Sequence, residues 1–575
     1  MFRLNETHRQ QDIFSMEAQL SPEIRKRLYG SKEYAFYTQV FCRIPESLFA
    51  ELYAEEGPSR PNAPVNTLVG AMILQHLNNW TFEELLDRVA FDLKVRAALG
   101  LWSLDEEPFC RATLFNFQRR VRDHMVHTGQ DKFQAVFDRL SEEDLERLGL
   151  KTTIQRSDST QIGSNIRQYT RIELLVEVVL RMWRVLSESH QAEYAERFRA
   201  FVGAPTAGQF LYRLRKSEIE ATLEQLGELY AWMLDALPTE YRDTEIYRVV
   251  CRVFAEQFTR VEERVAVREP SEIGSDSLQS PDDPDATYRR KKGEEYHGFV
   301  LHATETAHPE NALQLITDLA VAPNNHDDSR ILHERLEPMQ QKTPDLEELH
   351  TDAAYGSEDN DRVQAELGIA AVQSAIRGRT ARAPMTIEAA SETGPFRVTC
   401  AAGHTATSQP TRSRHKAVLA PGLCAQCPLA SVCPGVLRKG GGRTFYFDDA
   451  DVLRQARHRR LESLPPERRT LRANVEATMK EFKAPSRNGK LRTRTRPAAA
   501  QFGFLRAIAI NFGRIYRHLL GNSDPQEAFS ASPGGRVRAS VVLAALFTFV
   551  RRLQYGLRSS GTLDRFRSLA PVGLS

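Results

Sequence analysis

Two strand-like regions lie on either side of a long helical block, and this order limits the folds open to the chain. Residues 150–165 are rich in β-branched and small polar side chains, a composition typical of a strand. Apolar residues then recur with a helical period from about 170 to 265, and strand-like composition returns at 296–306 and 313–323. We therefore expect one mixed sheet whose strands come from both sides of a helical insertion.

A chain of 575 residues is too long for a single hydrophobic core, so several domains are expected. Thr81, with Glu84 three residues later, has the spacing of a capping box at the start of an N-terminal helix. The expected class is α/β. The predicted domains are an N-terminal helical domain at 1–148, a core at 149–168, 286–390 and 444–520, a helical insertion and linker at 169–285, a Cys-rich subdomain at 391–443, and a helical tail at 521–575.

The formal net charge of +2 argues neither for nor against a polyanionic partner, but the distribution of charge is informative. Residues 484–520 contain no Asp or Glu, which favours contact with a phosphate backbone over a merely solvated basic face. The eight cations of this tract are Arg487, Lys490, Arg492, Arg494, Arg496, Arg506, Arg514 and Arg517.

The sequence favours a cytoplasmic location. The first twenty residues are polar and lack the apolar core of a signal peptide. The most apolar stretch, 539–550, has twelve residues, too few to span a bilayer, and no membrane partner is expected. Seven cysteines spread thinly over the chain do not form the framework of a secreted disulfide-rich protein.

Three carboxylates far apart in the sequence are candidates for a shared metal site. Asp158 falls where the first predicted strand ends, and Asp352 ends or follows a later strand. At strand ends an α/β sheet exposes polar groups next to a crevice. The third candidate, Glu476, lies on a helix predicted over 466–486.

The spacing around Glu476 places cations on the same helical stripe. Arg469, Arg472 and Lys483 are seven, four and seven residues away from it. A surface ladder of salt bridges would have the same spacing, and Asp352 would fit an ordinary turn equally well. The residues alone leave these alternatives open.

Taken together, these motifs resemble those of bacterial insertion-sequence transposases of the DDE type, in the branch whose last motif is Tyr-x2-Arg-x3-Glu-x6-Lys. The segments 280–306 and 507–515 and the N-terminal helices are also similar to that branch. The tyrosine position holds Arg469, which departs from the pattern. The matching motifs are "SDST" at 157–160, "HTDAAYGS" at 350–357, and Arg472-x3-Glu476-x6-Lys483.

The resemblance implies an RNase H-like core in which Asp158, Asp352 and Glu476 are the catalytic acids. They would hold two Mg2+ or Mn2+ ions, with Asp158 bridging both, and the site would cleave phosphodiesters and transfer strands in cut-and-paste transposition. The implied partners are double-stranded DNA, as terminal inverted repeats and target DNA, and a second copy of the chain in a homodimer. The protein would then be nucleoid-associated. The predicted DNA-binding residues are Arg472, Lys483, Lys490, Arg492, Arg494 and Arg496.

Four of the seven cysteines lie close together in the pattern Cys400-x3-His404-x19-Cys424-x2-Cys427-x5-Cys433. The CxxC pair would supply two thiolates from one tight turn, and a separate loop would supply another, which suits a closed structural zinc site. The four cysteines are the expected ligands, with His404 left out. A redox CxxC is the rival interpretation, but it leaves the other two cysteines unexplained.

Two other functions are compatible with the same residues. One is a catalytically decayed, transposase-derived protein that binds DNA and regulates. The other is a nuclease with the same core that cuts DNA without joining strands.

Overall fold

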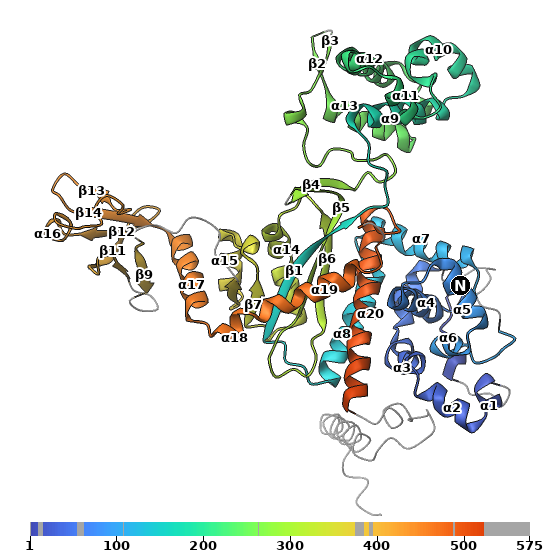
Figure 1. The fold of residues 1–575 in the computed structure, drawn as a ribbon, viewed down its shortest axis with the longest axis horizontal. Helices are drawn as coiled ribbons and strands as arrows, with labels where there is room; N and C mark the ends of the chain where they lie inside the picture. The colour runs from blue at the N-terminus through green and yellow to red at the C-terminus, as the bar shows by residue number, and fades with distance from the viewer. Residues whose placement is uncertain are drawn as a thin grey trace, which may run out of the picture.

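The structure is a computed structural model, shown in Figure 1. It describes residues 2–9, 15–54, 62–106, 109–262, 264–291, 293–373, 384–389, 395–486 and 489–522. The predicted tail, apart from residues 521 and 522, lies outside the described residues, as do the apolar stretch 539–550 and Arg487. Within the described part of the chain, none of the helices combines the length and the apolar character needed to cross a membrane.

A mixed sheet lies at the centre of the molecule (Figure 1). Its described strands follow the order β6-β5-β1-β7-β8, and β4 pairs with the first part of β5. Strand β1 is antiparallel to β5 and parallel to β7, and β8 is parallel to β7. The strands are β1 (Ile154–Gly163), β4 (Thr287–Lys291), β5 (Glu294–Thr306), β6 (Ile316–Pro323), β7 (Glu348–Thr351) and β8 (Ala370–Gln373).

The strands before and after the helical block therefore share one sheet, as the sequence predicts. Strand β1 is buried although many of its side chains are polar, and such side chains form hydrogen bonds with other side chains. The side-chain Nε2 of Gln155 donates to Thr343 Oγ1 at 2.8 Å, and Thr317 Oγ1 donates to the side-chain Oε1 of Gln155 at 2.6 Å.

Different helices cover the two faces of the sheet. Successive side chains of β5 show this, because they point to opposite faces. Leu301 and Ala303 belong to the core that contains α20 (Arg496–Asn522), whereas Val300 packs with Ile331 of α14 (Asp328–Lys342). Asp158 is paired with Ala303 and so lies on the α20 face.

The N-terminal helices pack against α20 and share its hydrophobic core. Thr81 caps α5 as predicted, with its side chain accepting from the Glu84 amide and the Glu84 side chain accepting from the Thr81 amide. The helices are α1 (Met16–Gln19), α2 (Pro22–Tyr29), α3 (Lys32–Gln39), α4 (Val65–Asn78), α5 (Phe82–Phe91), α6 (Leu93–Ala98), α7 (Arg111–Thr128) and α8 (Lys132–Arg147).

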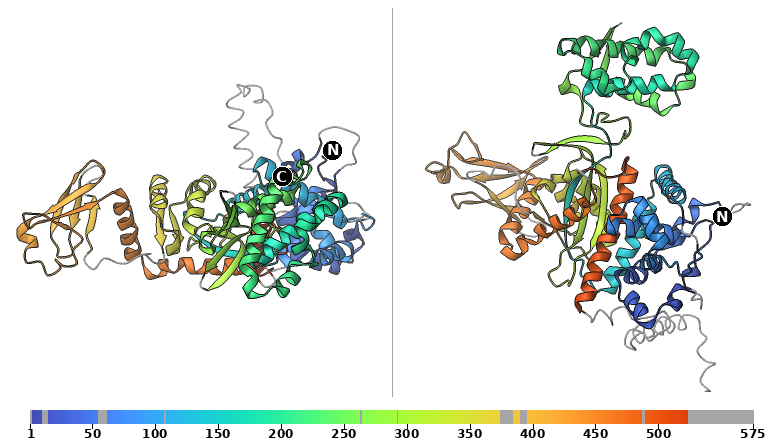
Figure 2. Two further views of the ribbon diagram at one scale, coloured as in Figure 1. Left: turned by 90° about the horizontal axis from the view of Figure 1, so that it is seen from above. Right: turned by 45° about the vertical axis from the view of Figure 1, so that its right-hand side comes forward.

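The block between β1 and β4 is helical and has its own hydrophobic core, which includes Val179 and Tyr230. It ends in a hairpin that the sequence analysis did not identify, and Figures 1 and 2 show the block projecting from one end of the central sheet. Its elements are α9 (Arg171–Val185), α10 (Glu188–Val202), α11 (Ala207–Arg213), α12 (Ile219–Ala236), α13 (Glu245–Gln257), β2 (Phe258–Val261) and β3 (Arg264–Val267).

The cysteine-containing region forms a second, antiparallel sheet that projects in another direction (Figure 2). This sheet was not predicted, and it extends beyond the predicted limits of 391–443 on both sides. Helix α17 (Asp449–Ser463) leads back from it to the core, where it packs near α15 (Glu358–Glu366). The second sheet contains β9 (Thr386–Ala389), β10 (Phe396–Thr399), β11 (Thr405–Pro410), β12 (His415–Leu419), β13 (Val436–Leu437) and β14 (Arg443–Phe447), with the short helix α16 (Pro421–Cys424) between β12 and β13.

The single helix predicted over 466–486 is wrong. The chain forms α18 (Pro466–Arg469), a 3-10 turn η8 (Leu471–Asn474) and then α19 (Val475–Lys483). Arg156 of β1 donates to the Leu471 carbonyl at 2.8 Å, so this carbonyl pairs with the sheet rather than within a continuous helix. The break brings η8 against the sheet.

Candidate active site

Three different elements supply the candidate acids. Asp158 lies in the middle of β1, and the expectation that the strand ends there is wrong, because residues up to Gly163 remain paired with β5. Asp352 directly follows β7, as predicted, and its carboxylate accepts a hydrogen bond from the Ala354 amide at 2.8 Å. Glu476 lies in the first turn of α19. Because β1 and β7 are parallel neighbours and α19 packs on β1, the fold gathers the three acids.

The guanidinium of Arg472 is the point on which the three carboxylates converge. Its Nη2 lies 2.9 Å from Asp158 Oδ2 and 3.7 Å from Asp352 Oδ2. Its Nη1 lies 3.8 Å from Glu476 Oε1. A single cation thus faces all three acids.

The three candidate acids differ in how far their side chains are exposed to solvent. The side chain of Asp158 is 12% exposed, that of Asp352 is 31% exposed and that of Glu476 is 62% exposed. Burial raises the pKa of Asp158 above its ordinary value, while the charge of Arg472 acts in the opposite direction. Asp158 is therefore held within the sheet, Asp352 lies at the end of a strand, and Glu476 faces solvent from a helix.

A buried ion cluster fixes the helix that carries Glu476. Glu305 of β5 is 1% exposed and pairs with Arg156 at 2.6 Å and with Arg514 of α20 at 2.7 Å. Thr478 of α19 donates to the same carboxylate at 2.7 Å. We call these four residues the Glu305 cluster; it ties β1, β5, α19 and α20 together just behind the acids.

Sequence reasoning missed the Glu305 cluster. Glu305 lies in the strand segment 296–306, and nothing in its local sequence distinguishes it from an ordinary surface acid. Only the register, which pairs Arg156 with Glu305, brings the two charges together on the face of Asp158.

A further buried acid, Asp328, lies on the opposite face of β1. Ser159 donates to its Oδ1 at 2.5 Å, and the Asp328 side chain is 3% exposed. Because Ser159 and Asp158 alternate across the strand, Asp328 is separated from the three acids by the sheet.

The predicted DNA-binding cations after Glu476 fall into two groups. Lys483 is exposed at the end of α19, and Arg496 is exposed at the start of α20. Lys490, Arg492 and Arg494 are anchored by backbone carbonyls: Lys490 to Ile166 at 2.7 Å, Arg492 to Trp80 at 2.9 Å and Arg494 to Asn165 at 2.8 Å. Arg494 also pairs with Asp282 at 3.2 Å.

Two other arginines of the acid-free tract have structural roles. Arg506 is buried and donates to the backbone carbonyls of Glu481 and His76, which joins α20 to α19 and α4. Arg514 belongs to the Glu305 cluster. The tract is therefore not a uniform basic surface.

The four predicted zinc ligands line one small pocket at the edge of the second sheet. Cys400, Cys424, Cys427 and Cys433 are all half-buried there, and His404 lines the same pocket. Cys400 lies in a turn after β10, and the other three lie on or after α16. In its present arrangement, the described part of the chain contains no group of three or more His, Cys, Asp or Glu residues spaced to hold a metal ion.

Comparison with known proteins gives one match. Residues 33–120 match the family described as "Transposase domain (DUF772)", a segment that runs from α3 into α7. No curated protein and no solved structure matches the chain. The family match supports a transposase-family protein.

Proposed function

We propose that the chain is a DDE transposase that binds the ends of its element and catalyses DNA cleavage and strand transfer. The observation that carries this proposal is the convergence of Asp158, Asp352 and Glu476 on one guanidinium. Carboxylates repel one another, so a fold that assembles three of them needs a compensating cation. The match to a transposase domain supplies independent support.

The strand order is compatible with an RNase H-like core. Three antiparallel strands, β6-β5-β1, are followed by β7 and β8, which run parallel to β1. Asp158 lies on β1, and Asp352 directly follows β7. Helix α19, which follows α17 and α18 after the second sheet, carries Glu476. The helical block between β1 and β4 would then be an insertion into this core.

The donor set fits two Mg2+ or Mn2+ ions, because these hard cations prefer carboxylate oxygens. Asp158, Asp352 and Glu476 would hold them, with Asp158 shared. When bound, the ions would polarise the phosphate and activate the attacking oxygen. Arg472 would have to move from its present position between the acids and would then be free to bind a phosphate near the cleaved bond.

Cations along the surface next to the acids would hold the DNA. A groove of about 440 Å3 beside the end of β1 is lined by Lys483 and Lys490, and also by Glu294 and Glu295 at the start of β5. The exposed Arg492, Arg494 and Arg496 would extend this contact along the backbone without reading sequence. The N-terminal helices would bind the element's ends.

The Cys-rich sheet would be stabilised by a structural zinc ion. The four thiols share one pocket, which fits the donor set of a closed site, and Cys400, Cys424, Cys427 and Cys433 would be the ligands. A zinc ion there would fix the loops around α16 against the sheet.

The partners would be the terminal inverted repeats, target DNA and a second copy of the chain. Cut-and-paste transposition needs two element ends held together, and a homodimer supplies one site for each end. The protein would associate with the nucleoid.

A second candidate, a DNA-binding protein without catalysis, is favoured by one observation. Arg472 fills the space between the three acids, and an arginine fixed there would exclude metal ions. This candidate predicts DNA binding with no metal-dependent cleavage.

The test is Mg2+-dependent cleavage of linear DNA that carries the element's own end, with wild type and Asp352→Asn compared. The matched control is Asp359→Asn, which alters an exposed acid of α15. We expect wild type and the control to cut and Asp352→Asn to bind DNA without cutting. Binding without cleavage by all three proteins would favour the second candidate, and cleavage without strand transfer would indicate a nuclease.

A further inference from the structure

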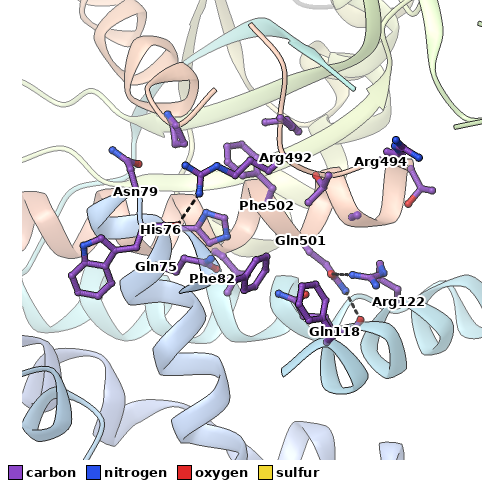
Figure 3. Close-up of a pocket in the computed structure, with 18 residues that line it drawn as sticks. Gln75, His76, Asn79, Phe82, Gln118, Arg122, Arg492, Arg494, Gln501 and Phe502 are labelled. Carbon is purple, nitrogen blue, oxygen red and sulfur yellow. Dashed lines mark hydrogen bonds between the residues drawn. The ribbon is translucent and has the colours of Figure 1, made fainter. Parts of the chain in front are cut away.

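A pocket of about 350 Å3 lies where the N-terminal helices meet α20 and the loop 491–495 (Figure 3). Helix α4 and the turn after it form one side, α7 forms another, and the basic loop closes the third. Its volume is within the range of roughly 300–1,000 Å3 found for small-molecule sites. The active-site proposal makes no use of this pocket.

Three chemical kinds of side chain in the pocket wall could contact a ligand. Aromatic rings come from α5, α7, α20 and the turn before α5, amides come from α4, the turn after it, α7 and α20, and guanidinium groups come from α7 and the basic loop. Among the described residues, no acidic side chain lines it. The aromatic rings are Trp80, Phe82, Phe115 and Phe502; the amides are Gln75, Asn79, Gln118 and Gln501; the cations are Arg122, Arg492 and Arg494.

Contacts within the wall orient these groups. Arg492 is held by the Trp80 carbonyl at 2.9 Å, and Arg122 donates to the Gln501 side chain at 3.4 Å, as Figure 3 shows. Phe82 and Phe115 pack at a centroid separation of 4.6 Å. Thr493 also lines the wall, and its hydroxyl is buried with no hydrogen-bond partner in the described part of the chain.

The charge of the pocket is positive at neutral pH and comes from arginine alone. Burial lowers the pKa of His76 to about 3, so this ring is neutral, and it packs edge-on against Phe502. The pocket therefore suits a ligand with an aromatic, hydrogen-bonding body and a negative group.

The pocket lies next to the groove beside the active site. Leu491 lines both cavities, and Gly163 at the end of β1 forms backbone hydrogen bonds with Gly489 and Leu491. Asp158 is five residues before Gly163 on the same strand, a span of about 17 Å at 3.3–3.4 Å per residue. A DNA strand leaving the acids along Lys483 and Lys490 would reach the pocket within a few nucleotides.

We infer that this pocket binds an unpaired nucleotide of the DNA strand that passes the active site. The base would stack on the aromatic rings and hydrogen-bond to the amides, and Arg122, Arg492 or Arg494 would bind the phosphate. The inference rests on the proposed function, because it assumes that DNA lies in the adjacent groove. The same chemistry would suit a free nucleotide, and the test separates the two sources.

The test compares the affinity for single-stranded oligo-deoxythymidylate with that for an abasic chain of equal length and charge. We expect the oligonucleotide with bases to bind about tenfold tighter or more, since stacking on a protein aromatic ring contributes this much per base. Phe115→Ala combined with Gln118→Ala should remove most of the difference. Tyr212→Ala, which removes an aromatic ring that is 91% exposed in the helical block, is the matched control and should leave it unchanged.

Photocrosslinking of the wild-type protein provides a readout that does not depend on a variant. With one thymine replaced by 5-iodouracil, crosslinks should map to Trp80, Phe82 or Phe115. Crosslinks confined to other segments, or equal binding of the base-containing and abasic chains, would overturn the inference. Crosslinking of dTMP at these rings without any preference for the base-containing chain would assign the pocket to free nucleotides and would also overturn it.

Duplex binding and Mg2+-dependent cleavage, measured on the same samples, separate the two proposals. Cleavage by a protein that does not distinguish bases from abasic sites would leave the transposase proposal intact and reject the pocket. Base-dependent binding at the pocket without cleavage would support the pocket and reject the transposase proposal.

Discussion

Arg472 Nη2 lies 2.9 Å from Asp158 Oδ2, and this contact places a guanidinium where the proposed active site would hold a metal ion. The same side chain reaches Asp352 and Glu476, so its single positive charge offsets part of the repulsion among the three acids in the present state. The arginine and a divalent cation would compete for the same three carboxylates. Metal binding should therefore require Arg472 to leave.

Replacing Arg472 by Gln should strengthen binding of Mn2+ in the absence of DNA, because the competing cation is gone. We expect an increase in affinity on the order of tenfold, equivalent to about 1.4 kcal/mol. Titration calorimetry measures it, with Arg454→Gln on the exposed surface of α17 as the control. An unchanged affinity would mean that Arg472 does not occupy the metal position. Cleavage by Arg472→Gln should nevertheless fall, since the arginine would no longer bind phosphate.

Removing the carboxylate of the Glu305 cluster should destabilise the core. Glu305→Ala leaves Arg156 and Arg514 buried without their partner, which costs about 3–5 kcal/mol in comparable cases. The corresponding change at Glu310, an exposed acid paired with Lys151, should alter the free energy of unfolding by no more than about 1 kcal/mol. Thermal and chemical unfolding of the two variants measure the difference, and equal stabilities would contradict the structural role of the cluster.

The stability of the fold should fall on acidification because of His302. This ring is buried in β5, neither nitrogen has a hydrogen-bond partner in the described residues, and burial lowers its pKa to about 4. The unfolded state binds a proton near pH 6.5, whereas the folded state does not until about pH 4, so stability is complete above pH 6.5 and is lost as pH falls toward 4. The expected slope is about 1.4 kcal/mol per pH unit within that window.

His302→Phe removes the proton-binding group and keeps an aromatic ring at the site. Its free energy of unfolding should depend less steeply on pH between 6.5 and 4 than that of wild type. His308→Phe, at a half-buried position beyond the end of β5, is the control. Denaturant unfolding at pH 7.0 and pH 5.0 checks this. Parallel pH profiles for wild type and His302→Phe would show that this ring does not cause the loss of stability on acidification.

The Cys-rich sheet should contain one zinc ion per chain, measurable by elemental analysis of the purified protein. Cys427→Ser should lose the ion, and a chelator should lower the temperature at which the second sheet unfolds, because ligand binding contributes to folding. Cys110→Ser, at an exposed site on the N-terminal helices, should retain it. Full zinc content in Cys427→Ser would remove this cysteine from the ligand set.

The sequence was informative where a residue pattern reports directly on local structure. The helical block, the capping box at Thr81 and the strand before Asp352 are local features, and periodicity, spacing and composition identify them. The sharing of one sheet by β1 and β5 followed from strand-like composition on both sides of the block. The transposase resemblance is supported by the match at 33–120.

The features that could not be predicted from the sequence depend on contacts between residues far apart in the chain. The break between α18 and α19 arises because Arg156, more than 300 residues away, binds the Leu471 carbonyl. The burial of Arg506 and Arg514 likewise depends on α4, α19 and β5. A cation in an acid-free tract gives no local sign of whether it faces solvent or an acid buried elsewhere.

The most direct test of the central claim is a change of metal preference at Asp352. Asp352→Cys replaces a hard oxygen ligand by a softer sulfur, which disfavours Mg2+ more than Mn2+. If Asp352 holds a catalytic ion, the variant should lose cleavage of element-end DNA in Mg2+ and recover part of it in Mn2+. Cleavage in Mg2+ at the wild-type rate would contradict the claim and would return Asp352 to the role of a turn residue.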